Sequence, residues 1–380
     1  MSKKRVYSLL FAAALLLWSI VGVASTMGTR AKTTCYEVQL DAYRRMETAM
    51  QAVKDYKQAY GIEFSPLDLR KTGMIGEEYN GITTTLGALE AKRTTADPNM
   101  AAMVVRMFTE AGLAAGDNVG AGFSGSFPAL NLAVIAACDA MELNLTYISS
   151  VGASTYGANN PQLTFPEMAH LLYMDGLIST DSRLVTMGGD YDTGHGMDET
   201  LAAEIEQRLQ TAGLELMKQP DYNANLTARR KLYEAAGIDC FVAVGGNTTS
   251  LGQGETTVVG QGLLESTLSV GRIDEKSGLV QWYQAQGLPV INLLNIKQIV
   301  ADYALPFDPL VTSVAGESAV FYTTAYPRGL ITAALASVLA LLVWLWWMRR
   351  PVDPETQLSI GAKENGGKPY AERGTRPWKK

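Results

Sequence analysis

Two long uncharged apolar segments limit how this chain of 380 residues can fold. Residues 6–29 contain VYSLLFAAALLLWSIVGVA, and residues 329–348 read GLITAALASVLALLVWLWWM. A helix of about 20 residues spans the hydrocarbon core of a bilayer, since each residue rises about 1.5 Å. The sequence therefore predicts membrane-spanning helices at residues 6–28 and 329–348.

The charges beside these segments predict their orientation. Residues 1–5 contain the basic run KKR, and residues 349–380 begin with two arginines. Basic flanks are retained on the cytoplasmic side of a membrane. We therefore expect a two-pass protein of the inner (cytoplasmic) membrane, with both termini in the cytoplasm and the large middle part extracytoplasmic or periplasmic. A cleaved secretory signal is the alternative for the first segment, because VAS at 23–25 offers small residues near a possible cut.

Composition excludes two other classes of protein. Hydrophobic residues make up 47% of the chain, which is too many for a disordered protein. Lys and Arg number 32 against 38 Asp and Glu, whereas a protein that mainly binds nucleic acid is typically basic. We therefore expect no nucleic-acid partner, and we expect the lipid bilayer to be the partner of the two apolar segments.

The three cysteines indicate packing rather than a disulfide framework. Cys138 ends the apolar run LNLAVIAAC, and Cys240 begins CFVAV, so both are expected to lie in the core. The spacing of these two residues and Cys35 is not that of a zinc site. One bridge between Cys138 and Cys240 is the alternative.

Residues 97–328 alternate between helical and strand-like segments. This alternation predicts a layered α/β domain with a mainly parallel sheet and flanking helices. The expected strands are a short one near Val119 and the runs LNLTYISS, RLVTM, CFVAV and LPVINLL. The expected helices are MAAMVVRMFTEA, PALNLAVIAACDAM, FPEMAHLLYMDGL, MDETLAAEIEQRLQTAG, TARRKLYEAAG, GLVQWYQAQG and IKQIVADYAL.

Residues 29–96 are expected to form a membrane-proximal helix followed by an irregular segment. The helix is indicated by an apolar stripe with spacings of three, four, three and seven: Tyr43, Met46, Met50, Val53 and Tyr60. A helix that packs on its own domain is favoured, and a stalk or partner-binding helix is the alternative.

A glycine-rich loop is expected after the strand near Val119. Its GAGFSGS matches GxGxxG at Gly120, Gly122 and Gly125, which favours close approach of an anion to backbone NH groups or, alternatively, a tight turn. The same segment resembles a nucleophile elbow in which Ser124 is the nucleophile. His195 is then the candidate base, so a Ser124–His195 catalytic pair is one hypothesis.

A second loop, GGDYDTGHGMDE, holds carboxylates close to His195. Asp190, Asp192 and His195 are candidate ligands of a divalent cation. A solvated acidic loop is the alternative, and the sequence identifies no other cofactor.

Further loops carry many hydroxyl and amide groups but no evident base. They are candidates for binding a polar ligand, or for satisfying their own turns. With the glycine-rich loop, the candidate ligand-binding residues are Gly122, Gly125, Ser126, Ser149, Ser150, Ser154, Thr155, Asn159, Asn160, Gly246, Asn247, Thr248 and Thr249.

These loops also carry a resemblance to a known family. Residues 122–168, which begin GFSGSFPALNLAVIAACDAM, and the run FVAVGGNTTSLG resemble the bacterial poly-gamma-glutamate system proteins. That resemblance implies a membrane protein whose partners are the poly-gamma-glutamate synthase and export membrane subunits. It implies a pathway and no catalytic residue.

The acidic middle part argues against simple attraction of that polyanion. Its negative charge repels a polyglutamate chain over about 8 Å at physiological salt. Direct binding of the polymer therefore needs a local basic patch, and the candidates are Arg70 with Lys71, Lys92 with Arg93, and the run RRK at 229–231. Ordinary charged helix faces are the alternative.

Three functions follow as hypotheses. The first is an accessory subunit that assists synthesis, export or retention of the polymer without catalysis. The second is a γ-glutamyl hydrolase or transferase that uses Ser124 and His195. The third is a solute-binding or sensory domain outside the cytoplasm.

Overall fold

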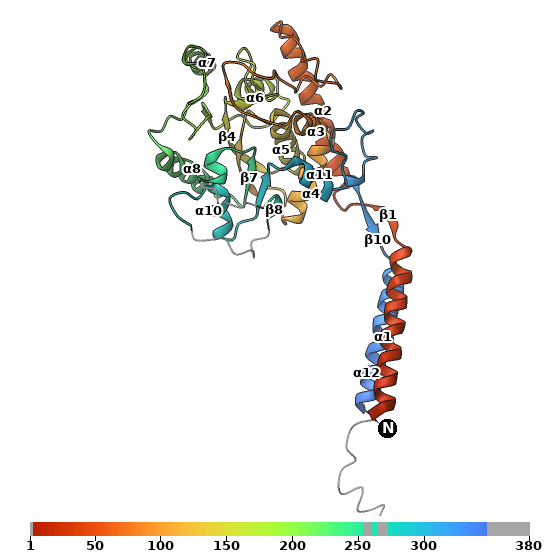
Figure 1. Cartoon of the computed structure of the whole chain (residues 1–380). Coiled ribbons are helices and arrows are strands. Elements are labelled where there is room, and N and C mark those ends of the chain that lie inside the picture. Colours follow the sequence, from red (N-terminus) through yellow and green to blue (C-terminus); the bar gives the residue numbers. More distant parts are fainter. Residues whose placement is uncertain (1–2, 254–259, 265–272, 348–380) are drawn as a thin grey trace, which may run out of the picture. The chain divides into compact units, whose positions relative to one another are not determined.

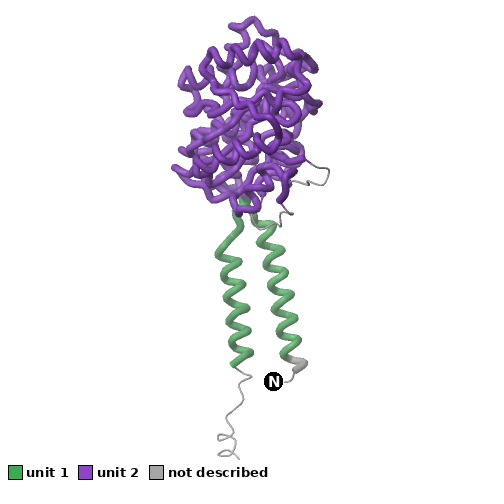
Figure 2. The backbone as a smooth tube through the Cα atoms, turned by 90° about the vertical axis from the view of Figure 1, so that its left-hand side faces the viewer, with its two compact units in different colours: residues 1–30, 324–380 green, residues 31–323 purple. Residues whose placement is uncertain are grey.

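The computed structural model describes residues 3–253, 260–264 and 273–347 (Figure 1). It divides into two compact units (Figure 2). One comprises the described parts of Met1–Arg30 and Thr324–Lys380, and the other is Ala31–Thr323. Residues 31–96 therefore belong to the same unit as the α/β core, and the boundary expected at residue 97 does not coincide with a boundary between units.

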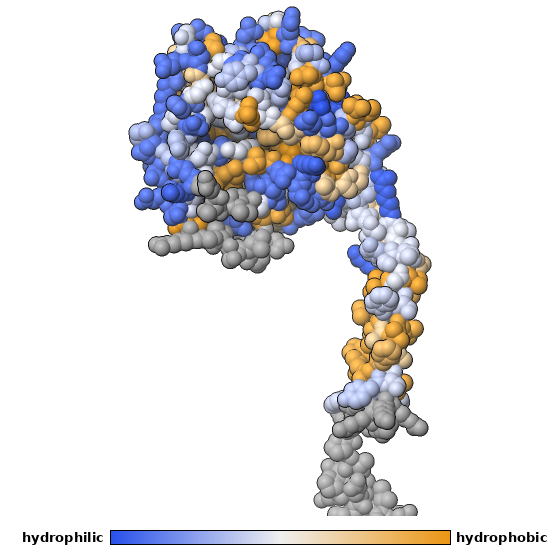
Figure 3. Space-filling view, in the orientation of Figure 1, coloured by the Kyte–Doolittle hydropathy of each residue, from blue (hydrophilic) through white to orange (hydrophobic). Residues whose placement is uncertain are grey.

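The smaller unit contains two apolar helices, α1 (Lys3–Thr26) and α12 (Arg328–Trp347), which lie side by side and antiparallel. Their segments Val6–Thr26 and Arg328–Trp347 are long and apolar enough to cross a membrane. Most of their large side chains are exposed, Trp18 and Trp347 among them, and Figure 3 shows apolar residues over the middle part of the helix pair. Exposed apolar area of this extent is unfavourable in water.

The larger unit is built on a six-stranded sheet of order β6-β4-β3-β7-β9-β8. All neighbouring pairs are parallel except β8 with β9, which is antiparallel. The five predicted strands are confirmed, and the short antiparallel β8 was not predicted. The strands are β3 (Asn118–Phe123), β4 (Asn144–Ser150), β6 (Leu184–Thr186), β7 (Cys240–Val244), β8 (Gly262–Leu264) and β9 (Val290–Leu293).

One face of the sheet carries the main hydrophobic core. Successive side chains of a strand point to opposite faces, and Val119, Ala121 and Phe123 of β3 all point to this one. Helices α4 (Asn99–Glu110) and α5 (Pro128–Met141) contribute to this core, and α2 (Tyr36–Ala59) packs against both of them. The stripe predicted on α2 is buried there from Tyr43 to Val53, whereas Tyr60 lies beyond the end of the helix and is exposed.

The opposite face carries a second core under α8 (Tyr222–Ala236) and α10 (Leu279–Ala285). Tyr233 of α8 lies directly on β3 and donates a hydrogen bond of 2.6 Å to the carbonyl oxygen of Ala121. A Cβ atom on Gly120 would lie 3.0 Å from the Tyr233 ring. This packing explains the glycine at position 120 without any bound anion.

The remaining elements lie outside the six-stranded sheet. The predicted helices are confirmed, but α8 begins five residues earlier than expected because the Asp221 carboxylate accepts a hydrogen bond of 2.8 Å from Ala224 N. Cys138 and Cys240 are buried and free, so they pack as predicted without a bridge. The other elements are β1 (Thr29–Lys32), β2 (Thr83–Thr85), α3 (Leu89–Thr95), β5 (Ala153–Ser154), α6 (Phe165–Met174), α7 (Glu199–Thr211), α9 (Thr248–Leu251), α11 (Ile296–Asp302) and β10 (Tyr322–Ala325).

Candidate functional site

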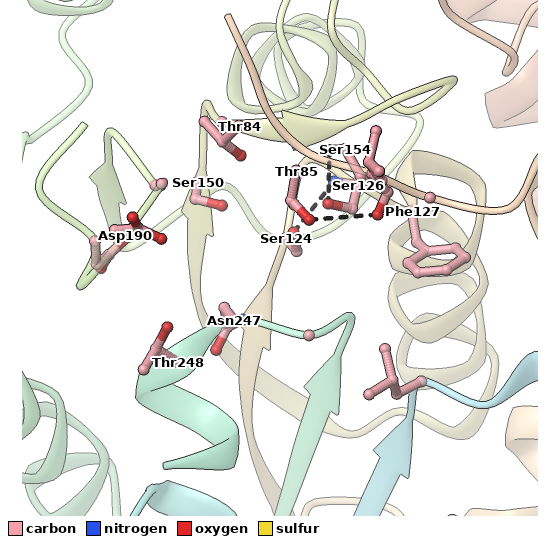
Figure 4. Close-up of a pocket in the computed structure, with 18 of the residues that line it drawn as sticks. Thr84, Thr85, Ser124, Ser126, Phe127, Ser150, Ser154, Asp190, Asn247 and Thr248 are labelled. Atoms are coloured by element: carbon pink, nitrogen blue, oxygen red, sulfur yellow. Dashed lines mark hydrogen bonds between the residues drawn. The ribbon is translucent and has the colours of Figure 1, made fainter. Parts of the chain in front are cut away.

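The strand order creates a crevice at the carboxyl edge of the sheet. From β3 the chain proceeds outward to β4 and β6, and from β7 it proceeds outward in the other direction to β9. The loops that follow β3 and β7 therefore diverge, and ligands of open parallel sheets bind at such a point. A pocket with a cavity volume of about 450 Å³ lies there (Figure 4), within the range of about 300–1,000 Å³ of small-molecule sites.

Loops from all the parallel strands line this pocket. Ser124 and Ser126 follow β3, Ser150 ends β4, and Asn247 follows β7. In Figure 4 Asp190 lies on the side of the pocket opposite Ser126 and Ser154. Ten sequence-predicted site residues line it: Ser124, Ser126, Ser150, Ser154, Asp190, Asp192, Gly246, Asn247, Thr248 and Thr249.

Two of the predicted glycines have packing roles instead. Gly122 lies inside β3, not in the loop after it, and a Cβ there would lie 3.1 Å from Ser250 Oγ. A Cβ on Gly125 would lie 2.8 Å from the carbonyl oxygen of Val151 and 2.9 Å from that of Gly152. The pattern GxGxxG therefore reflects close packing of a helix and of two loops, and neither Gly122 nor Gly125 lines the pocket.

Other predicted residues fix the loops around the pocket without lining it. Ser149 is buried and hydrogen-bonded to Ser182, with 2.8 Å between their hydroxyl oxygens. The Asn159 amide accepts from Glu77 N and donates to Glu77 O, both at 2.9 Å. Asn160 accepts from the backbone of Gln162 in its own turn. Their hydroxyl and amide groups are used internally, which was the alternative stated for such residues.

The Ser124–His195 pair finds no support in this geometry. Ser124 lines the pocket, but His195 is exposed and is not among the lining residues. Ser124 Oγ accepts a hydrogen bond from Ser126 N at 3.2 Å. The backbone of Ser124 does not have a positive φ, whereas the serine of a nucleophile elbow sits in a strained turn.

The three candidate cation ligands, Asp190, Asp192 and His195, make separate contacts. One Asp192 oxygen accepts a hydrogen bond from Thr186 at 2.7 Å, and the other forms a short ion pair with Arg229. His195 pairs with Asp190 only through the backbone. Within residues 3–253, 260–264 and 273–347, the structure gathers no group of three His, Cys, Asp or Glu residues that could hold a metal ion. Asp192 instead anchors the loop after β6, which begins at Gly188 and closes one side of the pocket.

A buried lysine, which the sequence identified only as part of a candidate basic patch, also lines the pocket. Lys92 lies on α3, and its ammonium group donates hydrogen bonds to the Ser126 carbonyl and, at 2.8 Å, to Ser154 Oγ. Its Nζ lies 3.5 Å from the centroid of the Phe127 ring. Burial lowers the pKa of Lys92 from 10.5 to about 7, because a desolvated ammonium ion is unfavourable.

The segment that brings Lys92 to the pocket is held by pairing between distant parts of the chain. Strand β2 pairs in parallel with β5. Thr155 Oγ1 accepts from Gly87 N at 2.8 Å and donates to Gly87 O at 3.0 Å. Thr155 therefore does not line the pocket but positions Gly87, which does.

Three arginines of the candidate basic patches are neutralised by ion pairs. The Arg70 guanidinium pairs with Asp97 at 2.9 Å, and Arg93 pairs with Asp308. Arg229 forms an ion pair with Asp192. These three arginines are structural, and the lysine in the pocket wall has no comparable ion pair among the described residues.

Comparison with known proteins adds no relative. The chain matches no protein-family model, no curated protein and no solved structure. The resemblance to the poly-gamma-glutamate system proteins therefore stays a prediction, and no activity is taken from another protein.

The pocket is suited to a ligand with carbonyl or carboxylate oxygens. Hydroxyl and amide groups of Ser124, Ser126, Thr248 and Asn247 offer donors and acceptors from several loops. A lysine that is half protonated near pH 7 adds a cation for a carboxylate or, when neutral, a base. Binding through such directed hydrogen bonds selects by shape and chemistry and requires no extended basic surface.

Proposed function

We propose that this protein is a membrane-anchored accessory subunit of a bacterial poly-gamma-glutamate synthesis and export system. In this proposal α1 and α12 span the inner membrane, both termini are cytoplasmic, and the larger unit lies outside the cytoplasm. Its partners are the synthase and export membrane subunits. Two helices able to cross a bilayer, with basic residues at the outer ends of their sequences, support the topology.

The proposed contact with the polymer rests on the pocket at the carboxyl edge of the sheet. A polyglutamate chain presents a carboxylate and an amide in every residue. The pocket offers hydroxyl and amide groups together with Lys92, which lies in its wall. We infer that the pocket holds a short γ-glutamyl segment or chain end, because Arg70, Arg93 and Arg229 of the candidate basic patches are already paired with carboxylates.

The test is genetic complementation in the host cell. Deleting the gene is expected to lower the amount of surface-attached polymer, and the wild-type chain is expected to restore it. Gly87→Leu is expected to fail, because a side chain there meets Ser154 Oγ at 2.7 Å and Lys92 Cε at 3.1 Å from the first added carbon. Polymer would be measured per cell and chain abundance by immunoblot of the membrane fraction.

Two outcomes would count against the proposal. Unchanged polymer in the deletion strain would remove the link to the pathway. Full restoration by Gly87→Leu at wild-type abundance would show that the pocket is not needed.

A further inference from the structure

The pair formed by Ser154 and Lys92 has a geometry that ligand binding alone does not require. Ser154 Oγ lies 2.8 Å from Lys92 Nζ, and both residues line the pocket. Serine is a weak nucleophile until a base within hydrogen-bond reach accepts its proton. Among the described residues near Lys92, no carboxylate forms an ion pair that would hold it permanently charged.

Burial of Lys92 favours its neutral form, because a desolvated ammonium ion is unfavourable. The Ser126 carbonyl and the face of the Phe127 ring position Nζ and stabilise its charged form, but neither is a carboxylate. A lysine that is desolvated in this way loses its proton near neutral pH, which is the condition for a general base. Lys57 is also buried, but it lies outside the pocket and near Asp68 and Glu77.

Space in front of the pair is kept open by a glycine. A Cβ on Gly87 would lie 2.7 Å from Ser154 Oγ and 3.1 Å from Lys92 Cε. The φ of Gly87 is not in the left-handed region, so the backbone itself does not demand glycine. Because Gly87 has no side chain, Ser154 and Lys92 stay accessible from the pocket. The two hydrogen bonds between Thr155 Oγ1 and the Gly87 backbone hold Gly87 in this position.

We propose that Ser154 is a nucleophile, that Lys92 is its general base, and that the pocket catalyses acyl transfer from an amide. Ser154 Oγ attacks the carbonyl carbon while its proton passes to Lys92 Nζ. The tetrahedral intermediate collapses, the C–N bond breaks, and the leaving amine takes the proton from Lys92. The acyl group remains as an ester on Ser154.

A second half-reaction releases the acyl group. Lys92 takes a proton from water, the resulting oxygen nucleophile attacks the ester carbon, and the proton returns to Ser154 Oγ as the acid leaves. An acceptor amine in place of water gives transfer instead of hydrolysis. The substrate class, a γ-glutamyl amide, rests on the proposed function, whereas the reactivity of Ser154 does not.

The test is labelling of the full-length protein in detergent micelles with a fluorophosphonate, a small reagent that phosphonylates activated serines. The Oγ–P bond forms and fluoride leaves. One adduct is expected, at Ser154 by peptide mapping. Ser154→Ala should lose it, Lys92→Met should slow it by about 100-fold or more, and Gly87→Ala should slow it by obstruction. Ser182→Ala and Lys57→Met are the matched controls for a buried serine and a buried lysine, and both should label at the wild-type rate.

Mapping on the wild-type chain decides the matter even if a variant fails to fold. No adduct, an adduct at another serine, or equal labelling rates in Lys92→Met and wild type would overturn the inference. Such a result would leave the proposed function intact, because polymer display is measured separately. Labelling at Ser154 together with unchanged polymer in the deletion strain would instead support the catalytic pair and contradict its placement in that pathway.

Discussion

Arg229→Met is expected to lower the free energy of unfolding of the larger unit by about 3–5 kcal/mol. The side chains of Arg229 and Asp192 are only 4% and 7% exposed, and removing the guanidinium leaves the Asp192 carboxylate without its charge partner. Thr186 and Asn225 still donate hydrogen bonds to that carboxylate, but they bring no positive charge. The loop from Gly188 onward should therefore lose its anchor along with global stability.

The measurement uses the two buried thiols as reporters of unfolding. In a Cys35→Ser background, Cys138 and Cys240 react with a thiol reagent only when the core opens, so their labelling rate against urea gives the free energy of opening. Arg183→Met is the control, because Arg183 pairs with Glu215 on the surface and should change stability by less than about 0.5 kcal/mol.

A second variant separates loss of charge balance from loss of packing. Asp192→Asn combined with Arg229→Met removes both charges, so it should cost less than Arg229→Met alone. An effect of Arg229→Met no larger than that of Arg183→Met would contradict the role given to this pair.

Lys92→Met is expected to change how stability depends on pH. The pKa of Lys92 is lowered in the folded state from 10.5 to about 7, so the unfolded state binds more protons between these values. Stability of the wild-type chain therefore gains a contribution from Lys92 as pH rises from about 7 to 10.5, and loses it as pH falls back. Between pH 6 and 9.5 this contribution is on the order of 3 kcal/mol. Lys92→Met should lack it.

Urea unfolding curves followed by circular dichroism at several pH values measure this difference. Lys57→Met is the matched control, because burial lowers the pKa of Lys57 only to about 8. The two variants should therefore differ between pH 7 and 8, where Lys92 contributes to the wild-type slope and Lys57 does not. Identical pH dependence in wild type and Lys92→Met would mean that Lys92 is protonated throughout.

The sheet was predictable because its strands are short, apolar and buried on both faces. CFVAV became β7, and LNLTYISS became β4 with one residue fewer at its start. Strand β8 has only three residues and pairs antiparallel at the edge, so it lacks the long apolar run that marks a central strand. The early start of α8 was missed because Asp221 was not recognised as its cap.

The loops of the pocket were also predictable, for a topological reason. Parallel strands end at one edge, so Ser124, Ser150 and Asn247 meet although they are far apart in sequence. The roles assigned to two residues were not predictable in the same way: Gly122 lies in a strand, and His195 does not line the pocket.

Lys92 could not be singled out as the base from its sequence context. The run LEAKRTT has the charge pattern of an exposed helix, and Arg93 beside Lys92 does form an ordinary ion pair with Asp308. Its burial depends on contacts with Ser126 and Ser154, which are 34 and 62 residues away. Long-range packing of this kind leaves no local periodic signal.

The pocket at the carboxyl edge of the sheet is proposed to hold a γ-glutamyl segment. Hydrogen–deuterium exchange of the full-length protein in detergent micelles, with and without a synthetic γ-linked glutamate oligomer, tests it most directly. We expect slower exchange in residues 84–92, 124–127 and 246–249, and little effect of an α-linked oligomer of equal length. Unchanged exchange, or slower exchange confined to residues outside these three segments, would contradict the proposal.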